Sequence, residues 1–113
     1  MSQFAPLIAA ITRHRGVTAC VVVSADDGIV VDGTAHVGVK LNAFAALTAS
    51  LLRKTTRASE AAGFGAVTFL ELEATEGKVL ASGRGGLLVV AVAEPRVNVG
   101  LLRVELRRAV EAL

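Results

Sequence analysis

The chain has 113 residues, of which 53% are hydrophobic and 19% are charged, and its net charge is +2. This length predicts one domain, residues 1–113, with enough buried surface for a core of its own. The low charge and the lack of Trp and Tyr argue against a surface that binds nucleic acids. No apolar run is long enough for membrane insertion.

No leader sequence precedes the first apolar segment, so we expect a cytoplasmic protein. Cys20 is the only cysteine, which leaves no disulfide framework and no cysteine-based metal site. Because Cys20 begins the apolar run Cys-Val-Val-Val, we interpret it as a buried structural thiol.

The first predicted element is a helix, because apolar residues recur at helical spacing between Phe4 and Ile11. We expect Ser2 to cap its N-terminus and Pro6 to lie in its first turn, where proline is tolerated. Gly16 ends this segment.

A β-hairpin follows the first helix. Residues 17–25 carry no charge on either face, which predicts a strand that is covered on both sides. Asp26-Asp27-Gly28 is typical of a hairpin turn. Residues 29–31 then form a shorter second strand, which we expect to end at Asp32-Gly33.

A long helix is predicted over residues 39–62, a segment without proline that ends before Gly63. One broad arc of this helix is expected to pack on the core and carries Leu41, Phe44, Leu47, Thr48, Leu51, Leu52 and Thr55. The opposite arc is small and uncharged, which favours close approach of a second copy of the chain; it carries Asn42, Ala43, Ala46, Ala49 and Ser50. Selection of alanine for helix propensity alone is the alternative.

Three strands and a helix complete the chain. Residues 67–73 alternate, with Glu71 and Glu73 on one face, which predicts a strand near an edge of the sheet. Residues 78–82 form the next strand. Residues 87–93 are apolar on both faces and predict a central strand.

Asn98 is the expected cap of the last helix, whose buried stripe comprises Leu102, Leu106, Ala109, Val110 and Leu113. The tight turns between strands require antiparallel pairing. The predicted fold class is therefore α+β: a five-stranded antiparallel sheet with helices on both faces, in the order α-β-β-α-β-β-β-α.

No pattern of residues predicts an enzyme, a cofactor site or a metal site. His14 and His36 do not have the spacing of metal ligands. Asp26-Asp27 is explained by its turn, and nothing near Glu71 and Glu73 in sequence would position them for acid–base chemistry. The glycines at 83, 85 and 86 lie between strands and lack the Lys-Ser/Thr of a phosphate-binding loop.

The order of elements and several local sequences resemble the roadblock/LC7 family, whose fold is similar to profilin. The resemblance rests on Arg-Gly-Val-Thr-Ala-Cys-Val-Val-Val at 15–23 with Asp27-Gly28, the alanine-rich helix around 44–52, Gly-Lys-Val-Leu at 77–80, the strand at 87–92 and Asn-Val-Gly-Leu-Leu-Arg at 98–103. It covers nearly the whole chain.

The resemblance implies a non-enzymatic homodimer that acts as a regulator or scaffold of a small Ras-like GTPase, as bacterial members of the family commonly do. In the family, the middle helix and third strand form the dimer interface. Here the strand residues are Val67, Phe69 and Glu71. The paired helices would present Arg53, Lys54 and Arg57 to the GTPase, and the alternative role of these cations is solubility and complementing the helix dipole.

Two other functions stay open on the sequence. The chain could be a structural assembly subunit without a GTPase partner, or a small-molecule sensor of the PAS type. A sensor requires a cavity with converging polar groups, and the Ala- and Val-rich central strands argue against one. A heterodimer with a paralogue also stays open.

Overall fold

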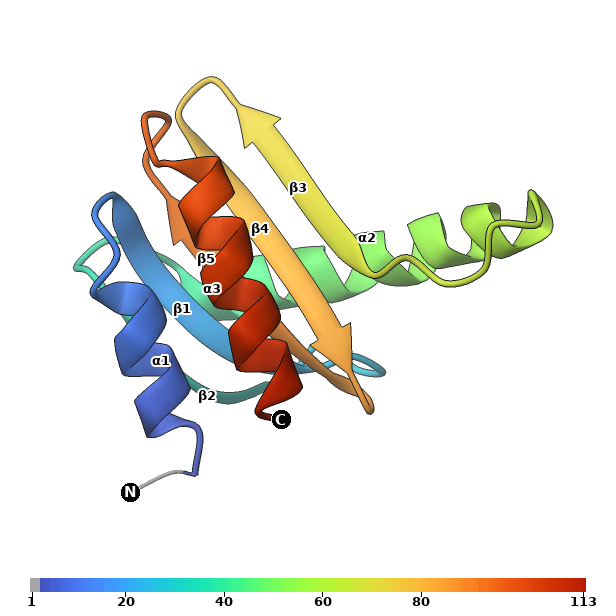
Figure 1. Ribbon diagram of the computed structural model, residues 1–113, viewed down its shortest axis with the longest axis horizontal. Helices are drawn as coiled ribbons and strands as arrows, with labels where there is room; N and C mark the ends of the chain where they lie inside the picture. Colours follow the sequence, from blue (N-terminus) through green and yellow to red (C-terminus); the bar gives the residue numbers. More distant parts are fainter. Residues whose placement is uncertain (1–2) are drawn as a thin grey trace.

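The structure, a computed structural model, describes residues 3–113. Its elements are α1 (Ala5–Thr12), β1 (Val17–Ser24), β2 (Val30–Ala35), α2 (Leu41–Ala61), β3 (Phe69–Ala74), β4 (Gly77–Arg84), β5 (Leu87–Ala93) and α3 (Val99–Glu111). Every pair of neighbouring strands is antiparallel, in the order β2-β1-β5-β4-β3 (Figure 1). The predicted fold class is confirmed, including the edge positions of the second and third strands.

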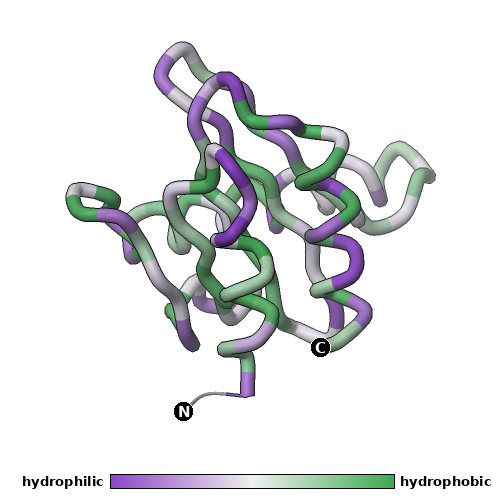
Figure 2. The backbone as a smooth tube through the Cα atoms, turned by 60° about the vertical axis from the view of Figure 1, so that its left-hand side comes forward, coloured by the Kyte–Doolittle hydropathy of each residue, from purple (hydrophilic) through white to green (hydrophobic). Residues whose placement is uncertain are grey.

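Helices cover both faces of the sheet because the inner strands are apolar on both faces. On one face α1 and α3 pack over a cluster that contains Ile11, Leu80, Leu102 and Leu106, all completely buried. On the other face α2 packs over a second cluster around Val21 and Val90. The hydrophobic colour in Figure 2 is accordingly concentrated in the strands at the centre of the molecule.

Several element boundaries differ from those predicted. Ser2 lies outside the described residues, and Phe4 is the residue that precedes α1 as N-cap. Strand β2 does not end at Asp32-Gly33: it pairs with β1 as far as Ala35. Gly33 lies inside the strand, at a position that leaves little room for a side chain: a Cβ there would lie 3.0 Å from the carbonyl oxygen of Cys20. The glycine thus permits close packing of the strand and does not end it.

At the other edge, β3 begins at Phe69, two residues later than predicted, and β4 continues to Arg84. Asn98 caps α3 as predicted, since its side-chain oxygen accepts a hydrogen bond from the backbone N–H of Leu101 at 3.1 Å. This bond satisfies one of the free donors of the first turn.

Helix α2 is longer than the surface it covers. It packs mainly on β1, β2 and β5, and its C-terminal half extends past β3, away from the body of the molecule (Figure 1). None of the helices in the described part of the chain combines the length and the hydropathy that a bilayer span requires.

Candidate partner-binding surface

The side of α2 that packs on the sheet carries Leu41, Ala45, Thr48 and Leu52. Thr48 is almost fully buried, and its hydroxyl donates a hydrogen bond of 2.7 Å to the carbonyl oxygen of Phe44. This internal bond satisfies the hydroxyl within the apolar layer. The remaining surface of α2 divides into two flanks and an outer face.

The flank of α2 toward the β1–β2 turn, which we call the turn-side flank, comprises Asn42, Ala46, Ala49 and Arg53. A Cβ on Gly28 would lie 3.2 Å from the Cα of Ala46 and 3.5 Å from the Cβ of Ala49. Gly28 itself has a φ of +74°, a conformation that favours glycine. The close approach predicted for these small residues therefore occurs, but within the chain itself.

One of the residues predicted for the dimer interface, Ala49, is consequently reassigned, whereas the place of Ala46 in the interface stays a prediction. Ala49 is completely buried in the core of its own protomer and cannot contact a partner. Ala46 keeps an exposed side chain, but its backbone packs beside the turn. The larger Leu47, predicted to face the core, is 46% exposed.

Arg53 fixes the same turn through its guanidinium group, whose Nη1 donates hydrogen bonds to the carbonyl oxygens of Ala25 at 2.8 Å and Asp26 at 3.1 Å. We expect Arg53→Ala to lower the free energy of unfolding by about 1 kcal/mol, a modest value because the bonds are solvent-exposed. Urea denaturation tests this. Lys54→Ala, the exposed neighbour, is the control and should change stability by less than about 0.5 kcal/mol. Equal effects would contradict the assignment.

The carboxylate of Asp27 lies in the same turn, and its protonation links the stability of the fold to pH. The backbone N–H of Ile29 donates to the Asp27 carboxylate at 3.0 Å and, with the Ser24 hydroxyl, lowers the pKa of Asp27 below its ordinary value of 3.8. The charged form therefore stabilises the fold above pH 3.8, and this contribution is lost as the pH falls through the lower, folded pKa. In carbon-detected NMR titrations, Asp27 should titrate below 3.8; an ordinary value would contradict the bond.

The opposite flank of α2, which we call the β3-side flank, comprises Phe44, Leu47, Leu51 and Ala58 at helical spacing. It faces sheet surface that α2 leaves uncovered. Leu72 of β3, 37% exposed, points to this side. The flank has no charge over its first three turns, so its exposed part is suited to apolar contact.

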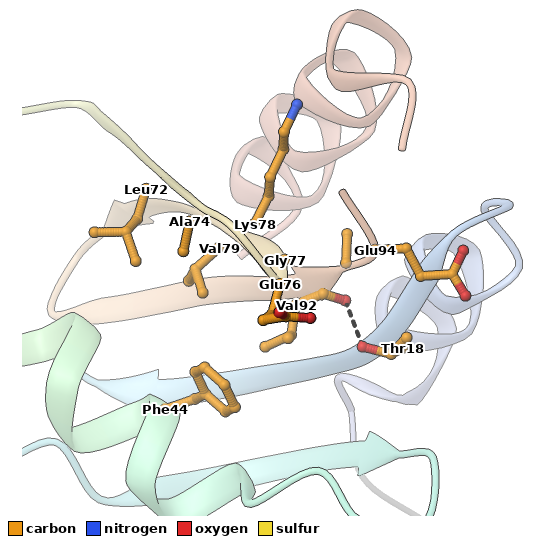
Figure 3. A pocket seen from close by; sticks show the side chains of 11 residues that line it. Thr18, Phe44, Leu72, Ala74, Glu76, Gly77, Lys78, Val79, Val92 and Glu94 are labelled. Atoms are coloured by element: carbon orange, nitrogen blue, oxygen red, sulfur yellow. Dashed lines mark hydrogen bonds between the residues drawn. The ribbon is translucent and has the colours of Figure 1, made fainter. Parts of the chain in front are cut away.

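A cavity of about 280 Å³ lies between this flank and the sheet. Its walls are apolar: Phe44 closes one side, and Leu72, Ala74, Val79 and Val92 the other (Figure 3). Lys78 and Glu94 also belong to the lining, and their charged ends point away from the space, whereas the carboxylate of Glu76 lies beside it (Figure 3). The cavity has no converging polar groups to orient a small-molecule ligand.

Strand β3 borders the cavity and forms one edge of the sheet, paired only with β4. Its outer side thus presents backbone donors and acceptors to another strand. Of the residues predicted for the interface here, Glu71 is exposed. Phe69 is packed against the α1–α3 layer, with the guanidinium carbon of Arg103 4.4 Å from its ring centroid.

The ring of Phe69 is therefore part of its own protomer, and only its backbone lies at the edge. Val67 precedes the strand, and its N–H donates to the Thr56 hydroxyl at 3.4 Å. The outer face of α2 points away from the sheet and carries Ala43, Ser50, Lys54 and Arg57. Asn42, on the turn-side flank, is exposed in the first turn of α2.

Cys20 does not contribute to this surface. The prediction that its thiol is buried is confirmed. It is fully buried in β1, and burial raises the pKa of the Cys20 thiol to about 12. Since the thiolate is the reactive form, we expect no reaction with an aromatic disulfide reagent in the folded protein and one thiol per chain in denaturant. Rapid labelling of the folded protein would contradict this expectation.

Phe64 and Leu72 are two further apolar side chains that sequence reasoning did not select. Phe64 follows α2 and is 84% exposed. Its exposure could have been predicted from the sequence. An apolar residue directly after the C-terminal glycine of a helix normally contacts an apolar residue of the last turn, and the last turn of this helix has only small side chains at those positions. Leu72 lies on the edge strand that the sequence predicts, but its partial exposure follows from the part of the sheet that α2 leaves uncovered, which depends on tertiary packing.

Comparison with known proteins agrees with this architecture. The Roadblock/LC7 domain family model matches residues 5–92, and no curated protein sequence matches the chain. The solved Roadblock/LC7 domain from Streptomyces avermitilis is 20% identical, with a TM-score of 0.87 over 98% of this chain and 94% of that chain.

Two solved MglB structures are also similar. One, described as MglB with tetrameric arrangement, is 17% identical with a TM-score of 0.86, covering 98% of this chain and 85% of that chain. The gliding protein MglB from Thermus thermophilus is 17% identical with a TM-score of 0.85, covering 97% of this chain and 84% of that chain. At these identities the structures establish the fold, while the family model covers more than half of the chain. The chain belongs to the Roadblock/LC7 family.

Proposed function

We propose that this protein is a non-enzymatic homodimer that binds a small Ras-like GTPase and acts as its regulator or scaffold. The observation that carries the homodimer is the presence of two incomplete surfaces in one chain, and the GTPase is the partner that the family resemblance implies. The sheet has apolar surface that α2 leaves uncovered, next to the open edge of β3, and α2 extends past that edge (Figure 1). Membership of the Roadblock/LC7 family and the tetrameric arrangement described for one similar MglB support self-association.

Symmetry explains how a second copy would complete both surfaces. A two-fold axis perpendicular to the sheet pairs β3 with its copy in antiparallel orientation and joins the two sheets. The same axis keeps both α2 helices on one side of the joined sheet and makes them antiparallel. The projecting half of each α2 then lies under the other protomer's sheet, and each contact occurs twice.

The outer faces of the two α2 helices would form the surface that receives the GTPase. Lys54 and Arg57 are exposed there and are suited to steer an acidic surface into contact. Arg53, also predicted for this role, is bound to the β1–β2 turn of its own chain. We therefore assign partner binding to Lys54 and Arg57 and a mainly structural role to Arg53.

Affinity capture from lysate of the source cells tests the partner, with GDP in one sample and a non-hydrolysable GTP analogue in the other. We expect mass spectrometry to identify a small Ras-like GTPase, enriched with one nucleotide. Its hydrolysis rate with and without this protein then distinguishes a regulator from a scaffold. Recovery of no GTPase in either state would contradict the proposal and favour the structural assembly subunit.

The surface is tested with the purified GTPase and the double variant Lys54→Glu/Arg57→Glu. We expect its affinity to fall by about tenfold or more while the dimer persists, because two attractive charges become repulsive. The control Arg96→Glu/Arg107→Glu makes the same change of net charge at exposed positions next to and on α3. Equal losses in both variants would show that only net charge matters.

A further inference from the structure

Phe64 is a large aromatic side chain that the described part of its own chain leaves almost uncovered. It follows Gly63 directly after α2, and 84% of its surface is exposed. The chain is not loose there: the N–H of Phe64 donates to the carbonyl of Ser59 at 2.9 Å, and the N–H of Gly63 donates to that of Glu60 at 3.0 Å. Gly63 has a φ of +84°. These two bonds form a Schellman motif, which fixes the backbone of the helix end.

The side chain of Phe64 lacks the contact that normally accompanies this motif. In a Schellman motif, the residue after the glycine usually packs on an apolar residue in the last turn. Here the corresponding residues of the last turn are Ser59 and Ala58, whose side chains are too small to cover an aromatic ring. The segment that follows α2 lies at the far end of the projecting half of the helix (Figure 1). The ring of Phe64, carried by this fixed backbone, is exposed to water.

The cavity beside Phe44 is the complementary feature. It measures about 280 Å³, more than the roughly 150 Å³ of an apolar cavity that binds benzene. Its walls are mainly apolar, formed by Phe44, Leu72, Ala74, Val79 and Val92, and among the described residues the Glu76 carboxylate is the one charged group that lies beside these side chains (Figure 3). It therefore fits an aromatic side chain better than it fits a polar ligand.

We infer that Phe64 of one protomer is an anchor that fills the cavity between α2 and the sheet of a second copy. This inference rests on the proposed homodimer. Phe44 lies in the first turn of α2, whereas Phe64 follows its last turn. In an antiparallel pair of these helices, the C-terminal end of one lies beside the N-terminal end of the other. The two-fold axis that pairs the β3 edges therefore brings each Phe64 to the cavity of its partner, and the contact occurs twice.

Truncation of the ring tests the energetic part of this inference. Phe64→Ala should weaken dimerisation on the order of 100-fold or more, because two benzyl groups lose apolar burial in each dimer. Since Phe64 is exposed in its own protomer, the variant should fold normally by circular dichroism. The control is Val37→Ala, a fully exposed apolar residue before α2, which should leave the dissociation constant unchanged in sedimentation analysis.

Fluorescence tests where the ring lies, because the chain contains no Trp and no Tyr. In Phe64→Trp the indole should emit at shorter wavelengths in the dimer than after dilution to the monomer. Val37→Trp should emit as an exposed indole at every concentration. A dimer by sedimentation in which the Trp at position 64 emits as an exposed indole would overturn the anchor and leave the dimer standing.

The outcomes separate the two proposals. A dimer that Phe64→Ala does not weaken would also overturn the anchor and leave the cavity to another occupant. If the unmodified chain is monomeric at all concentrations, the homodimer of the proposed function fails, and the anchor fails with it. A blue-shifted, concentration-dependent emission combined with a weakened Phe64→Ala dimer supports both.

Discussion

Replacement of Leu47 by Glu should convert the dimer to a folded monomer. Leu47 lies on the β3-side flank of α2 and is 46% exposed, so the carboxylate is solvated in the monomer. In the proposed dimer the antiparallel helices bury this flank, and each copy would enclose an unpaired charge. Such burial costs several kcal/mol per ion, so the dissociation constant should rise by about 1,000-fold or more.

A matched control exists on the opposite layer. Leu101 is also an exposed leucine on a helix, 57% exposed in the first turn of α3, and Leu101→Glu makes the same chemical change away from α2. It should leave the dimer intact, and a negative charge in the first turn of a helix is favourable. Sedimentation velocity over a range of concentrations reads out both variants. A Leu47→Glu protein that remains dimeric would remove this flank from the interface.

Ala49→Glu should have the largest effect on the fold itself. Ala49 is completely buried beneath the β1–β2 turn, with Gly28 in close contact. A glutamate there has neither space nor a partner for its charge, and we expect a loss of about 3–5 kcal/mol, enough to unfold a marginally stable domain. The expected product is an unfolded or insoluble chain rather than a soluble monomer.

Ala43→Glu is the control for this second change. It lies earlier on the same helix but is exposed on the outer face, and a carboxylate near the N-terminus of α2 complements the helix dipole. Thermal unfolding followed by circular dichroism should give a melting temperature close to that of the unmodified chain for Ala43→Glu. An Ala49→Glu protein that melts at the same temperature would show that Ala49 is not buried beneath the β1–β2 turn.

The sheet could be predicted from the sequence because its signals are strong. Both faces of residues 17–24 and 87–93 are apolar, which requires central positions, and the carboxylates of Glu71 and Glu73 indicate an edge. The hairpin turns follow from local glycine and aspartate chemistry. The ends of strands are harder to predict from local sequence. Gly33, for example, lies inside β2 because the backbone of Cys20 in the neighbouring strand approaches it closely, and this approach is a tertiary contact.

The orientation of α2 could not be predicted, for a physical reason. The first three turns carry no charge on any side, so periodicity gives no clear direction, and by size Leu47 is better suited to the core than Ala49. The space under the β1–β2 turn admits only a small side chain, and this limit comes from tertiary contact. The hydrogen bond from Arg53 to the turn could not be predicted either, because it is also a tertiary contact.

Both proposals require that the uncovered sheet surface and the β3-side flank of α2 belong to a second copy of the chain. Sedimentation equilibrium of the unmodified protein tests this most directly. We predict a mass of twice the 11.6 kDa of one chain at micromolar concentration, with dissociation only on strong dilution. A mass of one chain at every concentration would contradict the homodimer and require another partner for this surface.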